Sequence, residues 1–247
     1  MTALLSVSQL HKSYGGVRAT NDLNLEVQTG ELHAVIGPNG AGKTTLISQL
    51  SGNVFPDSGT ISFDGIDVTH MVEHARPHLG IARTYQITSL INSMSVIENL
   101  QLAIHAKQGH SFKFWKPYAD KNDVRTAAHE YAARVDLSSR AGIQVANLSH
   151  GEQRRLEVAM ALASDARLLL LDEPLAGLGP EEASEMIALL EALKGQQTIV
   201  LIEHDMDAVF TLADRISVMV YGHIIATGDP DQIRQNQDVQ HAYLGED

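Results

Sequence analysis

The sequence predicts an α/β protein with a mostly parallel core sheet, N-terminal antiparallel strands and an inserted α-helical subdomain. Three observations lead to this fold class. Residues 32–52 read as a strand, a glycine-rich loop and a helix. Apolar strands alternate with helices again over residues 168–220, which is typical of a parallel sheet. Between these stretches, residues 95–163 carry apolar residues at helical spacing.

The N-terminal third has the pattern of short strands joined by turns. Apolar segments at 4–10, 23–27 and 32–36 are separated by Gly15-Gly16 and Thr29-Gly30, and a turn cluster at 56–59 precedes a strand at about 60–65. After the helical stretch we expect strands at 168–172, 198–202 and 215–220, with helices after Pro180 and near 206–213. This order favours one large domain with a helical insert.

Composition limits the classes of function. The 247 residues include 18 basic and 30 acidic side chains, giving a formal charge of −12, which argues against broad binding of nucleic acid. There is no cysteine, so disulfides and thiolate metal sites are excluded. The start lacks the layout of a secretory signal and no apolar run approaches membrane-spanning length, so we expect a cytoplasmic protein that meets a membrane only through partners.

The glycine-rich loop matches the phosphate-binding pattern G-x-x-x-x-G-K-[ST] in full. It follows a strand and opens a helix, as that pattern requires. Backbone amides of such a loop surround phosphates, the lysine adds a positive charge, and the threonine hydroxyl can bind Mg²⁺. The chain is therefore expected to bind a nucleoside triphosphate through Gly37, Pro38, Asn39, Gly40, Ala41, Gly42, Lys43 and Thr44.

Two further strands end in polar residues where ligands gather in α/β sheets. LLLLDEP ends a buried strand with Asp172, placed to hold Mg²⁺, and Glu173, a candidate general base for an attacking water. TIVLIEHD repeats this arrangement, and His204 is placed to donate a hydrogen bond to a phosphate oxygen.

Residues 148–163, LSHGEQRRLEVAMALA, predict a capped amphipathic helix. Ser149 and Glu152 have capping-box spacing. The helix has an apolar stripe at helical spacing, formed by Leu156, Ala159, Met160 and Ala163.

Taken together, these motifs resemble the nucleotide-binding subunit of an ABC transporter over essentially the whole chain. The resemblance implies a core at about 1–88 and 164–247, a helical subdomain at about 89–163, and ATP with Mg²⁺ as cofactors. It assigns roles to residues in chain order: Tyr14 stacks on adenine, Gly37 to Thr45 form the Walker A loop, and Gln86 is the Q-loop residue, with catalytic and metal-binding roles. Ser149, Gly151 and Glu152 belong to the signature, Asp172 to Walker B, and Glu173 and His204 are catalytic.

A finer resemblance is to ATPases of branched-chain amino acid, urea and short-amide importers. It rests on segments such as GIARTYQ, LLLLDEPLAGLGPEE and QHAYLGED, and on an aromatic, basic insert at 109–123. Lipopolysaccharide-export ATPases share some of these segments and stay an alternative. A soluble ABC ATPase acting on DNA or ribosomes is a further alternative, as is a regulatory module that binds ATP without hydrolysing it.

The partners implied are a second ATPase subunit, identical or paralogous, membrane permease subunits, and indirectly an extracellular or periplasmic solute-binding protein. The location implied is the cytoplasmic face of the membrane. Two departures from the family pattern stand out: His150 and Glu152 in the signature, and Gly179 where an aspartate is usual. Ser149 and the amide of Gly151 are expected to reach nucleotide held by the facing subunit, and the His150 side chain is expected to face solvent.

Overall fold

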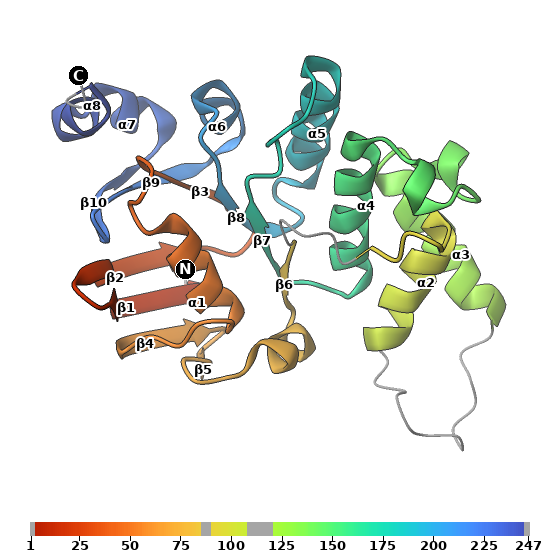
Figure 1. The fold of residues 1–247 in the computed structure, drawn as a ribbon, viewed down its shortest axis with the longest axis horizontal. Helices are drawn as coiled ribbons and strands as arrows, with labels where there is room; N and C mark the ends of the chain where they lie inside the picture. The colour runs from red at the N-terminus through yellow and green to blue at the C-terminus, as the bar shows by residue number, and fades with distance from the viewer. Residues whose placement is uncertain (1–2, 85–89, 108–120, 245–247) are drawn as a thin grey trace.

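The structure, a computed structural model, describes residues 3–84, 90–107 and 121–244. Two β-sheets lie beside one another, and a group of helices lies at one end of the molecule (Figure 1). The first sheet is antiparallel, with the order β2-β1-β4-β5 and the bounds Val17–Val27, Leu5–Tyr14, Ser58–Phe63 and Ile66–Asp67. This confirms the predicted N-terminal strands, of which β1 and β2 are longer than the pattern indicated and β4 begins two residues earlier.

The second sheet is parallel except for one edge strand. Its order is β10-β9-β3-β8-β7-β6, with the bounds His223–Gly228, Arg215–Val220, Leu32–Ile36, Thr198–Ile202, Leu168–Asp172 and Ile81–Arg83. Only β10, at the edge, pairs in the antiparallel direction among the described residues. The sequence pattern predicted β3, β7, β8 and β9 and did not indicate β6 or β10, because β6 is very short and β10 is half exposed.

The helices divide into those against the parallel sheet and those beyond its β6 edge. The first set is α1, α5, α6, α7 and α8, with the bounds Lys43–Ser51, Pro180–Leu193, Met206–Leu212, Pro230–Gln235 and Gln237–Leu244. The second set is α2, α3 and α4, with the bounds Val96–Lys107, Lys121–Arg134 and His150–Ala163. Short 3₁₀ turns occur at Glu73–Leu79, Ser138–Arg140 and Val145–Asn147. Most of the insert at 109–123 lies outside the described residues, and its last residues begin α3.

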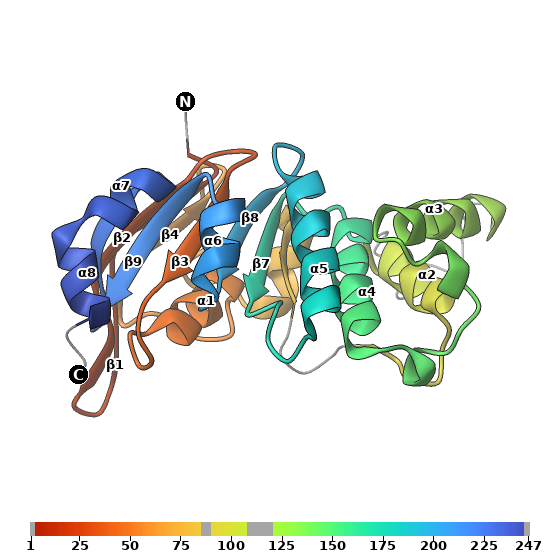
Figure 2. The ribbon, with the colours of Figure 1, turned by 90° about the horizontal axis from the view of Figure 1, so that it is seen from above.

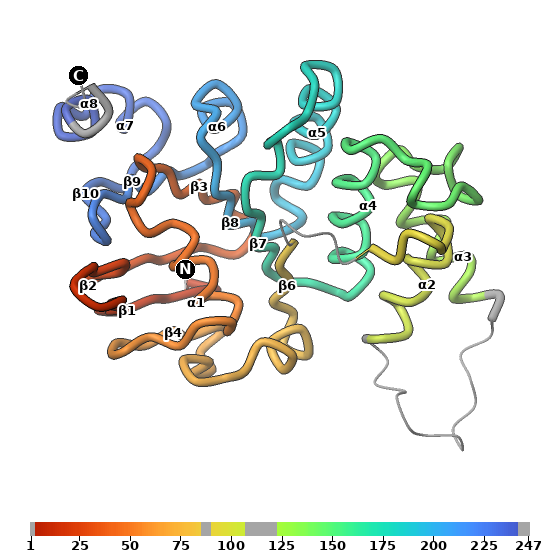
Figure 3. The backbone as a smooth tube through the Cα atoms, viewed as in Figure 1, coloured from red at the N-terminus to blue at the C-terminus, as the bar shows by residue number. Residues whose placement is uncertain are grey.

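Two hydrophobic cores lie on opposite faces of the parallel sheet. Leu168 and Leu170 of β7 face α1 and the antiparallel sheet, whereas Leu169 and Leu171 face α5, α6 and the helices of the second set. Side chains alternate between the faces of a strand, so an apolar run is what a strand covered on both sides requires. Figure 2 shows α5 and α6 along one face of this sheet, and Figure 3 shows the chain returning from α4 directly into β7.

A close backbone contact fixes β4 against a bulge in β1. Gln9 has φ of 47°, and the β1–β4 register shifts between Ser8 and His11. Gly59 of β4 lies against this bulge with φ of +92°, and a Cβ there would be 2.2 Å from the carbonyl oxygen of Gln9. Glycine is therefore required at 59 by conformation and by space.

We predict that Gly59→Ala destabilises the fold by about 3 kcal/mol, since it adds a backbone clash to left-handed strain. Gly65→Ala is the matched control, because Gly65 has φ of +76° but open space around it. It should lose only about 1 kcal/mol. Urea unfolding of both variants measures the difference, and equal losses would contradict the close contact.

Candidate active site

The phosphate loop is held between backbones of the two sheets. A Cβ on Gly42, which has φ of +107°, would lie 2.0 Å from the carbonyl oxygen of Ala19 in β2. On the other side, a Cβ on Gly37 would lie 2.0 Å from the carbonyl oxygen of Met219 in β9. The amide of Gly222 donates to the Ala41 carbonyl at 2.9 Å. These contacts position the loop at the start of α1, with its amides available to a ligand.

A cavity of about 340 Å³ lies over this loop and gathers predicted residues from four parts of the chain. Its walls come from the end of β1, from β2, from the loop with the first turn of α1, and from the residue after β7. The residues are Tyr14, Val17, Ala19, Asn39, Gly40, Ala41, Gly42, Lys43, Thr44, Thr45 and Glu173. Tyr14 is 52% exposed, and the Lys12 ammonium group lies over its ring, 5.7 Å from the ring centre.

Lys43 reaches back across the loop. Its ammonium group donates to the carbonyl oxygens of Gly37 at 2.6 Å and Pro38 at 3.1 Å. Burial lowers the pKa of Lys43 below its ordinary value, and the nearby Glu173 and Asp172 carboxylates oppose that shift. The lysine and both acids predicted from sequence therefore lie in one electrostatic environment.

Asp172 at the end of β7 is paired with an arginine that the motifs did not indicate. Its carboxylate is 3% exposed and accepts a hydrogen bond from Arg83 of β6 at 3.0 Å. Arg83 also donates to the hydroxyls of Ser48 and Ser51 in α1 at 3.3 Å. The pairing of β6 with β7 brings Arg83 here. We infer that Arg83 positions the Asp172 carboxylate relative to α1.

The donor set suits a Mg²⁺ ion bound largely through phosphate oxygens. Thr44 lines the cavity, and the Asp172 carboxylate is near enough to Lys43, which also lines it, to raise the pKa of that lysine. Among the residues that the structure describes, no group of three or more His, Asp or Glu side chains could enclose a metal. Mg²⁺ in phosphate sites uses one or two protein oxygens and substrate oxygens, so these residues fit it. The third predicted ligand, Gln86, lies outside the described residues.

Glu173 and His204 lie at the ends of neighbouring strands. His204 Nδ1 is 4.0 Å from Glu173 Oε1, and the His204 side chain is 65% exposed. Glu173 has φ of 50°, a strained value for a residue other than glycine, and its amide donates to the carbonyl of Ile202 at 2.8 Å. This backbone bond ties the turn after β7 to β8.

Glu203 holds the backbone at His204 and in the turn that follows Glu173, and it was not singled out from the sequence. Its carboxylate is fully buried and accepts the amides of His204 at 3.0 Å and Leu175 at 2.8 Å. Buried carboxylates of this kind are held by the hydrogen bonds they accept. The available signal was an acidic residue directly before His204 at the end of an apolar strand.

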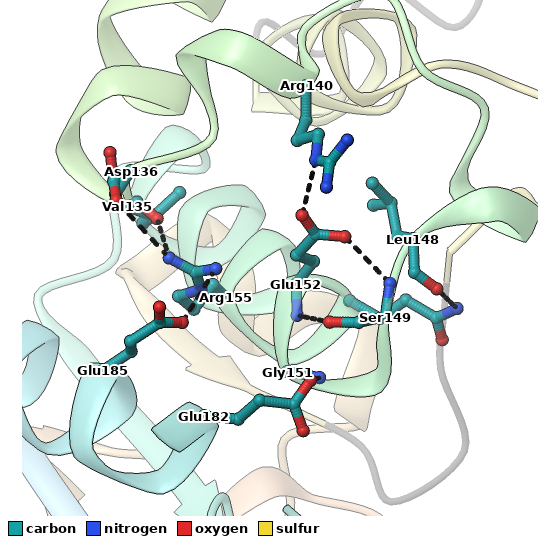
Figure 4. A network of polar contacts seen from close by, with 11 residues as sticks. Val135, Asp136, Arg140, Leu148, Ser149, Gly151, Glu152, Arg155, Glu182 and Glu185 are labelled. Atoms are coloured by element: carbon teal, nitrogen blue, oxygen red, sulfur yellow. Dashed lines mark hydrogen bonds and ion pairs between the residues drawn. The ribbon is translucent and has the colours of Figure 1, made fainter. Parts of the chain in front are cut away.

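The start of α4 has the capping box that the sequence predicted. The Ser149 hydroxyl accepts the amide of Glu152 at 3.2 Å, and the Glu152 carboxylate accepts the amide of Ser149 at 2.8 Å. Arg140 donates to the other oxygen of Glu152 at 2.6 Å (Figure 4). Residue 150 is exposed, as expected for His150.

The signature residues do not line the phosphate-loop cavity. Ser149, Gly151 and Glu152 are absent from its walls, and Figures 1 and 2 both show α4 apart from α1 with β7 between them. The predicted site residues are therefore in two groups, one around the phosphate loop and one at the start of α4.

The capping box predicts a specific pH dependence. Partial burial of Glu152 raises its pKa, but hydrogen bonds from Ser149 and Arg140 outweigh this effect and hold the pKa below its ordinary value. A carboxylate whose pKa is lower in the folded chain than in the unfolded chain stabilises the fold at pH values above its unfolded-state pKa. This stabilisation is lost as the pH falls through the folded-state pKa. The free energy of unfolding of wild type should exceed that of Glu152→Gln by about 1 kcal/mol at pH 7, and the two values should converge in acid. Urea unfolding across pH checks this. Glu191→Gln, an exposed control, should show no such convergence. A stability difference between wild type and Glu152→Gln that stays constant across pH would contradict this prediction.

Known proteins resemble this chain in sequence over nearly its whole length. The family model described as "ABC transporter" matches residues 20–176, and one described as "Branched-chain amino acid ATP-binding cassette transporter" matches residues 223–247. The chain is 40% identical to the high-affinity branched-chain amino acid transport ATP-binding protein BraF of Pseudomonas aeruginosa, with 98% of both chains covered. It is also 40% identical, with the same coverage, to the protein LivG of Escherichia coli, which has the same description.

Solved structures show the same fold. A crystal structure of an ATP-binding cassette in its ADP conformation is 28% identical, with a TM-score of 0.86 and full coverage of both chains. A nucleotide-free cassette is also 28% identical, with a TM-score of 0.84 over 99% of this chain and 100% of that one. Because the family model covers more than half of the chain and relatives match it nearly end to end, the chain belongs to the ABC transporter family and is one of its ATP-hydrolysing cassettes.

Proposed function

We propose that this cassette hydrolyses ATP to power import of branched-chain amino acids or related small polar solutes through membrane permease subunits. The observation that carries the proposal is the cavity that unites the phosphate loop with Tyr14 and Glu173. The names of BraF and LivG support the class of solute. The match of residues 223–247 to the branched-chain model favours import of amino acids over export of lipid.

Within one subunit, each residue around the loop has a distinct task. Loop amides and the Lys43 ammonium bind the β- and γ-phosphates, and Tyr14 stacks on the adenine. Glu173 accepts the proton of the attacking water, and His204 donates a hydrogen bond to a γ-phosphate oxygen. Thr44, Asp172 and Gln86 would hold Mg²⁺, which supplies charge neutralisation on the phosphates when bound.

The second group of residues serves a second subunit in this proposal. The start of α4 is separate from its own phosphate loop and presents backbone amides, which favour an anion. In this proposal two copies of the chain pair head to tail, which brings Ser149, Gly151 and Glu152 of one copy to ATP on the other. The pair then has two composite sites, each of which needs both chains.

Coupling to the membrane is proposed to occur where α2–α4 meet the core. A cavity of about 230 Å³ lies between β6, α2 and α4, with mainly apolar walls that include Ile81, Leu90, Ala103 and Met160. Its shape and chemistry suit a short segment of a permease subunit at the cytoplasmic face of the membrane. No helix in the part of the chain that the structure describes could cross a membrane. We also propose that residues 89–163 form a helical subdomain beside a core at 1–88 and 164–247.

The solute itself is chosen by the permease subunits and the solute-binding protein that delivers it. Purification of the chain from membranes should therefore recover permease subunits, and vesicles containing the assembled complex should take up labelled leucine when ATP is supplied. Recovery only with ribosomes or DNA would contradict the proposal. The net charge of −12 already disfavours such binding to nucleic acid.

Glu173→Gln is predicted to retain ATP binding and to lower the rate of hydrolysis by about 10²–10⁴-fold, since it removes the proton acceptor. It should accumulate as an ATP-bound dimer, which light scattering after gel filtration measures. Glu26→Gln, an exposed control on β2, should hydrolyse ATP like wild type. Turnover near the wild-type rate in Glu173→Gln would remove this residue from the role of base.

Ser149→Arg is predicted to abolish hydrolysis while leaving ATP binding to the monomer unchanged, because the bulky cation blocks only the facing subunit's nucleotide. Binding of a fluorescent ATP analogue and phosphate release separate the two effects. Ser138→Arg, exposed on a nearby 3₁₀ turn, is the matched control and should keep both. Loss of monomer binding in Ser149→Arg would show that Ser149 acts within its own chain.

A further inference from the structure

The start of α4 already contacts a carboxylate from its own chain. Glu182 lies in the first turn of α5, and its Oε1 accepts the amide of Gly151 at 3.1 Å (Figure 4). Its Oε2 accepts the amide of Gly179 more weakly, at 3.4 Å. One carboxylate thus joins the first turn of α4 to the start of α5.

The contact is close enough to determine the residue at 151. A Cβ on Gly151 would lie 2.8–2.9 Å from three carbon atoms of the Glu182 side chain, so the absence of a side chain at 151 is what admits this carboxylate. Hydrogen bonds from the Ser149 hydroxyl and the Gly151 amide hold the pKa of Glu182 below its ordinary value. The side chain is therefore an anion at neutral pH.

The packing of α4 on α5 does not depend on Glu182. Arg155, further along α4, forms an ion pair with Glu185 of α5 at 3.1 Å. The adjacent helices also share a hydrophobic core that includes Leu156, Met186 and Leu190. Glu182 can therefore withdraw from the helix start while the two helices stay packed.

We propose that Glu182 is an internal competitor for the γ-phosphate. Its carboxylate occupies the Gly151 amide, which in the proposed function on which this inference rests receives the nucleotide of the facing subunit. A phosphate oxygen and a carboxylate oxygen repel one another and cannot share the same amide proton. Closure of two cassettes on ATP therefore requires Glu182 to release the start of α4.

This contact sets the ATP concentration at which cassettes close. The state with Glu182 bound to α4 is favoured in the free subunit and cannot accept the second subunit's phosphate. The apparent affinity of the ATP-driven pairing scales with the fraction of subunits in which Glu182 has released the start of α4. Weakening the Glu182 contact should therefore make closure easier, although it removes a hydrogen bond from the folded chain.

The test uses the full-length chain with Glu173→Gln, so that ATP is bound and not consumed. Dimer formation is followed by analytical ultracentrifugation as ATP is titrated at a fixed protein concentration. Glu182→Gln keeps a neutral acceptor, and Glu182→Ala removes the acceptor. Glu181→Gln is the matched control, because Glu181 is the preceding residue and is exposed, and because its substitution removes the same charge. Thermal melts of every variant verify folding.

We expect the ATP concentration for half-dimerisation to fall by about tenfold in Glu182→Ala, less in Glu182→Gln, and to be unchanged in Glu181→Gln. An ATP concentration for half-dimerisation that is unchanged or higher in both Glu182 variants would overturn the inference and leave the proposed function standing. A fall in Glu181→Gln as large as in the Glu182 variants would have the same consequence. Failure of the Glu173→Gln parent to dimerise at any ATP concentration would instead overturn the paired site itself, and the competitor with it.

Discussion

The contact of the phosphate loop with two sheet backbones is the constraint on which the rest of the site depends. A side chain on Gly37 would clash with the carbonyl oxygen of Met219, and a side chain on Gly42 would clash with that of Ala19. This contact joins the antiparallel sheet, which carries Tyr14, to the parallel sheet, which carries the acids. Since β8 lies between β3 and β7, the residues that follow these strands come together at one edge. Geometry at that edge is thus set by hydrogen-bonded backbone and not by loose loops.

The site residues gather at the starts of two helices, where the backbone amides have opposite fates. At α1 the amides line an open cavity beside a lysine, whereas at α4 the chain supplies its own anions, Glu152 and Glu182. Glu152 caps the helix and is supported by Arg140. Glu182 comes from another helix, and in the inference above it is the carboxylate that the γ-phosphate displaces. In the proposed function, a site divided in this way responds to ATP and to a partner subunit together.

Local sequence determined much of this outcome, and contacts across the fold determined the rest. The phosphate loop, the strand ends at Asp172 and His204 and the capping box at Ser149 were all predictable, because each depends on residues only a few positions apart. The Arg83–Asp172 pair and the buried Glu203 carboxylate depend on which strands become neighbours, and a short strand such as β6 leaves no periodic signal. The contact from Glu182 to Gly151 spans 31 positions of sequence and follows from helix packing alone.

The central claim is that the two groups of site residues work on the same nucleotide only when they come from different chains. Mixing Lys43→Ala with Ser149→Arg tests this most directly. Each variant alone should be inactive, whereas a mixed pair contains one intact composite site, so an equal mixture should recover about a quarter of the wild-type ATPase rate. A mixture as inactive as its components would contradict the account and would place both groups in the service of a single chain.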